Sequence, residues 1–211
     1  MALDTYSNLK KSIQDWSHRN DVSSRIDDFI LITEQEMYNN SIESLEVREQ
    51  EISTQTDTVV GLDYIALPDG YKSMRAILLD DKTTDAQQYQ LTYTTPELLR
   101  RFSVNGCPSQ FTITDKVQFN RPVDAVYNIE IQHIAKIQAL TEDNPTNSIL
   151  TDYPAIYLSG CLWALYEWAK DGESAAASYS RFINAIKGAN LATKNGKYGP
   201  APAMRSEGWV V

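Results

Sequence analysis

Apolar residues recur at three- and four-residue intervals over the first forty positions, which is the spacing of an amphipathic α-helix. The first stripe predicts a short helix that Asp4 or Thr5 can cap by accepting hydrogen bonds from the first-turn amides. A second stripe follows the polar break at 18–22 and predicts a second helix, with Ser23 or Ser24 as its cap. The apolar positions of these helices are Tyr6, Leu9, Ile13 and Trp16, then Ile26, Phe29, Ile30 and Met37.

Between about Val47 and Ile137 the pattern changes to short β-branched and aromatic segments separated by Pro, Gly, Asp and Asn. These segments predict an antiparallel β domain. Apolar and polar residues alternate most clearly over 126–137, so one face of that strand should be buried. One or two helical turns are expected at 96–102. The predicted strands are 47–55, 63–67, 73–79, 90–93, 110–114, 116–120 and 126–137.

The last third of the chain returns to the helical spacing, with a helix expected to start at Pro154. Its apolar residues surround most of the helix, so we expect identical copies in a symmetric ring to cover part of it. Asp171 and Gly172 interrupt this stripe, and the next one predicts the second helix of an antiparallel hairpin. The residues assigned to helix packing or subunit contact are Tyr157, Leu158, Cys161, Leu162, Leu165 and Trp168.

Together these elements predict an α+β chain, in which a helical bundle built from both termini carries an inserted antiparallel β domain. Residues 1–46 and 138–192 should form the bundle, 47–137 the β domain, and 193–211 an extended C-terminal tail. The tail ends in Trp209, Val210 and Val211. Such an ending fits either a tether that becomes ordered when its apolar end binds a groove, or a frayed terminus.

The negative overall charge argues against a protein that binds nucleic acid. Among 211 residues, 19 are basic and 28 acidic, which gives a formal charge of -9, and no Lys/Arg cluster occurs. The longest apolar run, 155–169, is too short to span a bilayer and contains Glu167. The N-terminus lacks a basic region followed by an apolar stretch, so we expect neither a signal peptide nor membrane association.

Reactive groups are sparse along the sequence. His18 and His133 have no carboxylate or cysteine at metal-ligand spacing, and Cys107 and Cys161 form no CxxC pair. Nucleophile-elbow, phosphate-loop and dinucleotide-binding motifs are all missing. The acidic pairs at 27–28 and 80–81 are explained by a helix dipole and a turn. The sequence therefore assigns no catalytic, cofactor-binding or metal-binding residue, and we expect a protein that is not an enzyme.

Three segments of the chain stand out as a set: Tyr6-Ser-Asn-Leu-Lys-Lys-Ser-Ile-Gln-Asp-Trp16 with Arg19-Asn-Asp21, Leu67-Pro68-Asp69, and Asp143-Asn-Pro-Thr-Asn-Ser-Ile-Leu-Thr-Asp-Tyr-Pro154 leading into Tyr157-Leu158. They resemble head-to-tail adaptor (connector) proteins of short-tailed bacteriophages. The resemblance covers the chain from about Leu3 to Lys187 and rests on the order and spacing of the segments. Where a second acidic residue is expected after Leu67-Pro68-Asp69, this chain has Gly70.

The resemblance implies a structural virion protein of the phage neck, made in the host cytoplasm. Such adaptors form a ring, commonly of twelve copies, under the portal protein, where they extend the DNA channel and provide the platform for tail attachment. Nozzle and tail fibre proteins would be further partners, and an acidic channel would let genomic DNA pass during ejection without specific binding. The C-terminal segment often docks on the portal, which by position implicates Tyr198, Trp209, Val210 and Val211.

Two other functions remain open from the sequence. The chain could be a nozzle or tail-completion protein of the same tail machine, whose ring binds the far face of the adaptor. Its 12 tyrosines and 4 tryptophans could instead stack on sugars in a carbohydrate-binding tail module. Trp16, Trp163 and Trp168 lie on predicted helices, which favours a role in a core or a subunit contact.

Overall fold

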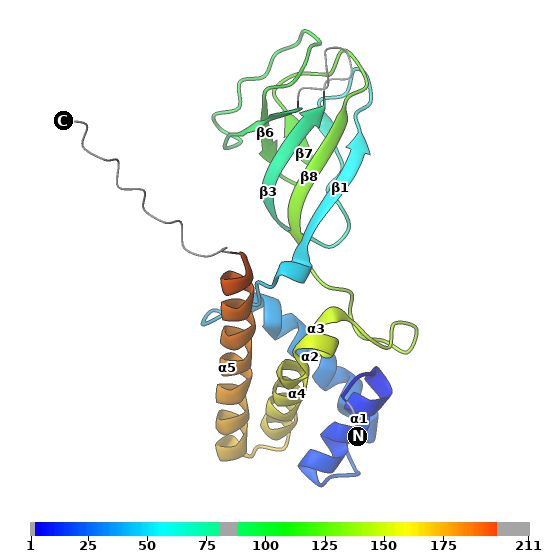
Figure 1. Cartoon of the computed structure of the whole chain (residues 1–211), viewed down its shortest axis with the longest axis vertical. Helices are drawn as coiled ribbons and strands as arrows, with labels where there is room; N and C mark the ends of the chain where they lie inside the picture. The colour runs from blue at the N-terminus through cyan, green and yellow to red at the C-terminus, as the bar shows by residue number, and fades with distance from the viewer. Residues whose placement is uncertain (1–2, 81–87, 198–211) are drawn as a thin grey trace, which may run out of the picture. The chain divides into compact units, whose positions relative to one another are not determined.

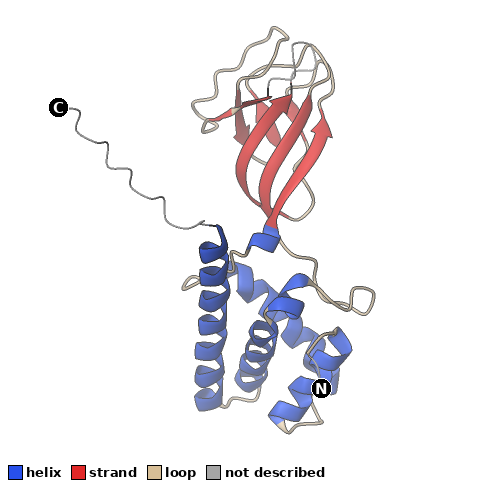
Figure 2. Cartoon of the chain, in the orientation of Figure 1, coloured by secondary structure: helices blue, strands red, loops and turns tan. Residues whose placement is uncertain are grey.

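The computed structural model describes residues 3–80 and 88–197, and the chain divides into two compact units. One unit is built from residues up to 48 and from 137 onward, and the other from residues 49–136. Helices make up the first unit and strands the second, apart from a short helical turn at its start (Figures 1 and 2). The predicted α+β class, with a β region inserted between N-terminal and C-terminal helices, is confirmed.

The two N-terminal helices differ in whether a side chain caps their first turn. The Thr5 hydroxyl accepts a hydrogen bond from the Asn8 amide at 3.3 Å, so Thr5 caps α1 as predicted. The predicted serine cap of α2 is wrong, because Ser23 and Ser24 lie in a 3₁₀ turn and α2 starts without a side-chain cap. The helices are α1 (Tyr6–Ser17), α2 (Ile26–Asn39), α3 (Ser148–Asp152), α4 (Pro154–Trp168) and α5 (Gly172–Lys197).

Helix α4 is the central element of the helical unit, since α1, α2 and α5 all pack against it. At Gly160 there is no room for a side chain: a Cβ there would collide with the Thr33 methyl group on α2 and lie 3.0 Å from the Phe182 ring on α5. The apolar stripes of α1 and α2 are buried as predicted, except at Trp16, which is 59% exposed. The first-turn acids Asp27 and Asp28 suit the dipole of α2.

The expectation that the extended tail begins at residue 193 is wrong for its first five residues, because α5 continues to Lys197. Contacts with the chain that follows α2 stabilise this extra length of helix. The Asn190 side chain accepts a hydrogen bond from the Glu46 amide at 2.8 Å and donates one to the Ser44 carbonyl at 2.9 Å. Thr193 is buried, and its hydroxyl accepts a hydrogen bond from the Arg48 amide.

The β unit contains two four-stranded sheets, with strand orders β1-β8-β3-β4 and β2-β7-β6-β5. All strand pairs are antiparallel except β5 with β6, which is parallel and differs from the predicted pattern. The predicted alternation along β8 is confirmed, since every second side chain from Ile129 to Ala135 is buried. The strands are β1 (Glu51–Asp57), β2 (Tyr64–Ile65), β3 (Tyr71–Asp80), β4 (Gln88–Gln90), β5 (Thr92–Tyr93), β6 (Gln110–Ile113), β7 (Val117–Phe119) and β8 (Asn128–Ala135).

Two other local expectations concern the start of β1 and the segment 96–102. The strand predicted to start at Val47 starts at Glu51, because Arg48–Gln50 form a 3₁₀ turn. Of the one or two helical turns expected at 96–102, one short turn forms, in which the Leu98 and Leu99 amides donate to the Thr95 carbonyl at 3.0 and 3.1 Å. Beyond it, the Phe102 amide donates to the Asn120 carbonyl at 2.9 Å. This last bond joins the end of the segment to the chain that follows β7, so the turn does not continue.

Candidate interaction surfaces of the helical unit

The apolar surface of α4 is covered largely by its own chain. Five of the six residues assigned to helix packing or subunit contact are buried, and only Trp168 is exposed, at 42%. The buried five are Tyr157, Leu158, Cys161, Leu162 and Leu165. The apolarity of this helix is therefore not by itself evidence for a neighbouring copy. That these six residues take part in contacts between subunits stays a prediction.

Buried polar groups within this core are hydrogen-bonded rather than reactive. The Thr33 hydroxyl donates to the Phe29 carbonyl at 2.8 Å and lies 3.5 Å from the Cys161 sulfur. Burial raises the pKa of the Cys161 thiol to about 12, so the thiol stays protonated near neutral pH. Cys161 is thus a packing residue without thiolate chemistry.

A second polar network, centred on Glu34 of α2, joins three segments of the helical unit. Its carboxylate accepts hydrogen bonds from the Leu140 amide at 2.8 Å and from the Tyr157 hydroxyl at 2.9 Å. The Asn147 side chain donates to the same Tyr157 oxygen at 2.8 Å and also caps α3. Burial raises the pKa of Glu34, and burial together with the neighbouring Glu34 raises that of Tyr157. These hydrogen bonds connect the segment that precedes α3 with both α2 and α4.

Sequence patterning alone does not identify this network. The apolar stripe assigns Tyr157 to packing, and no pattern assigns a role to Glu34. The one available signal is Asn147, which lies inside the segment 143–154 that resembles the phage adaptors. Because polar partners so far apart in sequence meet only in the folded chain, local periodicity cannot reveal them.

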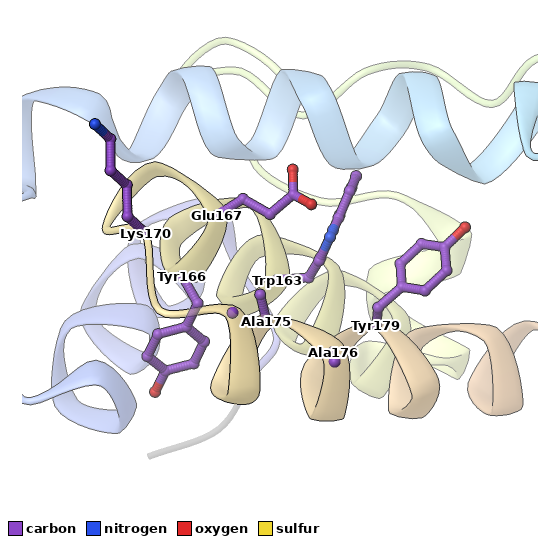
Figure 3. A pocket seen from close by; sticks show the side chains of 8 residues that line it. Trp163, Tyr166, Glu167, Lys170, Ala175, Ala176 and Tyr179 are labelled. Carbon is purple, nitrogen blue, oxygen red and sulfur yellow. The ribbon is translucent and has the colours of Figure 1, made fainter.

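An open groove runs over α4, between α2 and α5. It consists of two adjoining hollows of about 620 and 420 Å³ that share Trp163 and Glu167. Figure 3 shows the larger hollow, where side chains of α4 face Ala175, Ala176 and Tyr179 of α5. We call this surface the Trp163 groove, defined by Phe29, Ile32, Trp163, Glu167, Ala175 and Tyr179.

Aromatic rings give the Trp163 groove its floor and one end. The Trp163 ring stacks on Phe182 with a centroid distance of 6.4 Å and lies 5.2 Å from the Tyr179 ring. At the α2 side, the exposed Trp168 ring contacts Phe29, and the guanidinium groups of Arg19 and Arg25 lie over it at 5.2 and 5.7 Å. Such rings are typical of surfaces that bind protein partners.

A separate apolar hollow of about 330 Å³ lies beside Trp16. The sequence places Trp16 on the buried stripe of α1, but the residue is 59% exposed because it lies at the edge of this hollow beside α4 and α5. We call this surface the Trp16 face, defined by Trp16, Ala155, Leu158, Leu162, Ser178 and Arg181. From the sequence, Trp16, Trp163 and Leu158 are expected only to lie in a core or a subunit contact. Their grouping into two surfaces appears only in the folded chain, since each surface combines residues from several helices.

The remaining candidate residues fall into two groups. Tyr198, Trp209, Val210 and Val211 lie outside the described residues. His133 is buried and stacks on Tyr71, whereas His18 is exposed at the C-cap of α1. Within residues 3–80 and 88–197, no group of His, Cys, Asp and Glu is arranged to hold a metal ion. None of the helices in this part of the chain combines the length and apolarity that a membrane span requires.

Comparison with known proteins provides one family match. A family model described as SU10 adaptor protein matches residues 4–205, which includes both the helical and the β unit. A search of curated proteins found no significant match.

Proposed function

Because the chain belongs to the SU10 adaptor protein family of phage head-to-tail adaptors, we propose that it forms a ring under the portal, extends the DNA channel and carries the tail. The observation that carries this proposal is the extent of the family match, from residue 4 to residue 205. The family is one of structural virion proteins, generally without enzymatic activity. It follows that binding surfaces, rather than a catalytic centre, should perform the function.

Two features of the chain support this role. The Trp163 groove and the Trp16 face are two separate apolar surfaces on one helical unit, as a subunit with several neighbours requires. The formal charge of -9 favours a channel wall that repels the phosphate backbone, so DNA would pass without adhering to it. Portal protein on one side, with nozzle and tail fibre proteins on the other, would be the partners, and the number of copies would be twelve.

The test is direct binding to the portal. Purified chain mixed with the portal protein of the same phage should co-sediment with it and add a ring of density in electron micrographs. A chain that ignores the portal but binds other tail proteins would instead be a nozzle or tail-completion protein. Retention on glycan columns without portal binding would indicate the carbohydrate-binding alternative.

We further propose that the C-terminal residues Tyr198, Trp209, Val210 and Val211 bind the portal. A chain truncated after Lys197 keeps all of α5, so its thermal unfolding should match that of the full chain. Its affinity for the portal should fall at least about tenfold, because burial of large aromatic and aliphatic side chains dominates such contacts. The point variant Trp209→Ala tests one side chain of the tail and should reproduce part of the loss. Equal affinity of all three chains would exclude the tail as the portal contact.

A further inference from the structure

The Trp163 groove and the Trp16 face lie on different sides of the same two helices. On α4 the groove uses Trp163 and Glu167, whereas the face uses Leu158 and Leu162. At 3.6 residues per turn, the two sets are centred roughly a third of a turn apart. Two different surfaces that point in different directions are not restricted to pairing with themselves around a twofold axis. They can pair with each other from copy to copy, which produces a closed ring or a filament.

The two surfaces also match in chemistry. Each presents an aromatic ring beside small or aliphatic side chains, and Trp16, at 59% exposure, leaves more than half of its surface uncovered. Exposed charges of opposite sign also lie on the two surfaces: Glu167 is one of four exposed charged residues that line the groove, and Arg181 lies on the face. Within the described part of the chain, neither of these two charges takes part in an ion pair or a hydrogen bond.

The other charges along the groove are placed at its ends. Arg25 and Asp28 lie in the hollow next to α2, and Arg25 is already engaged with the Trp168 ring. Lys170 lies at the turn into α5, and in Figure 3 its side chain extends away from Tyr179. Glu167 is the only one of these four charged residues that borders both hollows. An incoming cation would therefore meet it in the middle of the groove.

We infer that the Trp16 face of one copy packs against the Trp163 groove of the next copy, with Arg181 opposite Glu167. This inference rests on the proposed ring and names the residues that form the contact between its subunits. A second copy is the favoured occupant because one chain carries both complementary surfaces, and neither Arg181 nor Glu167 has an ionic or hydrogen-bonding partner among residues 3–80 and 88–197. Every subunit then uses both surfaces, and the contact is heterologous.

Charge reversal gives a sharp test of this pairing. Arg181→Glu and Glu167→Arg each place like charges together at every contact, so each variant alone should associate at least about tenfold more weakly than the wild type. An equimolar mixture of the two variants should recover association. In an alternating assembly every contact again pairs opposite charges, because the two substituted side chains meet at one junction and the unchanged Arg181 and Glu167 meet at the next. Native mass spectrometry of the purified chains follows the assembled species.

Lys187→Glu is the matched control, because Lys187 is an exposed cation on α5 that belongs to neither surface. It should associate like the wild type, and all three variants should keep the wild-type circular dichroism spectrum. Single variants that associate normally, or a mixture that does not recover, would overturn the pairing. Normal association combined with lost portal binding in Glu167→Arg would show that the portal occupies the groove instead. A wild-type chain that binds the portal but never self-associates would remove this inference and leave portal attachment standing.

Discussion

At the scale of single residues, Gly160 sets how closely three helices of the bundle approach one another. Replacing it with alanine should lower the free energy of unfolding by about 1–3 kcal/mol, the usual cost of overpacking a core. The new methyl group would collide with Thr33 and press on the Phe182 ring at 3.0 Å. Urea unfolding of Gly160→Ala beside the wild type measures this change. Equal stability would mean that the two neighbours can move aside at little cost.

The same substitution at Gly188 should have the opposite effect. Gly188 lies within α5, and a Cβ there would meet no atom within 4 Å. Alanine restricts the unfolded chain and has the higher helix propensity, so the free energy of unfolding should rise by about 0.5–1 kcal/mol. Thermal or urea unfolding of Gly188→Ala checks the sign. A loss of stability there would point to a contact of α5 that the described residues do not contain.

Glu34 should make stability depend on pH in an unusual direction for a carboxylate. Burial raises its pKa in the folded chain above the unfolded value of about 4.3, so the folded state binds the proton more tightly. Its contribution is therefore full below about pH 4 and is lost as the pH rises through the raised pKa. Glu34→Gln does not titrate and can still accept hydrogen bonds from Leu140 and Tyr157.

The measurement is urea unfolding of the wild type and Glu34→Gln between pH 4 and pH 7. The free energy of unfolding of the wild type, relative to the variant, should decrease across this range. A difference that stays constant with pH would show that the Glu34 carboxylate is as well solvated in the folded chain as in the unfolded one.

At the scale of elements, apolar spacing located the elements better than it located their ends. The stripe of α2 and the alternation of β8 were predictable because each buries one regular face. The end of α5 was not predictable, because Asn190 and Thr193 form hydrogen bonds with residues about 145 positions away.

Trp16 fits the helical spacing of α1 but lies where that face leaves the core, and no local pattern marks that edge. The Trp163 groove and the Trp16 face were unpredictable for the same reason, since each needs several helices in place.

At the scale of the whole molecule, the β unit should fold without the helices. Its first and last strands pair with each other, since Glu51 of β1 lies opposite Ile134 of β8, and it has its own apolar core. A chain of residues 49–136 should therefore give a β-type circular dichroism spectrum and a cooperative urea transition. A non-cooperative transition would show that this core needs the helical unit for its stability.

The pairing of β1 with β8 has a further consequence for how such proteins can diversify. Both ends of the inserted segment leave the sheet from neighbouring strands, about 5 Å apart, so its points of entry and exit almost coincide. A different domain with equally close termini could be exchanged at this junction without lengthening the surrounding chain. Recombination between phages could thus replace the insert while the four long helices keep their arrangement.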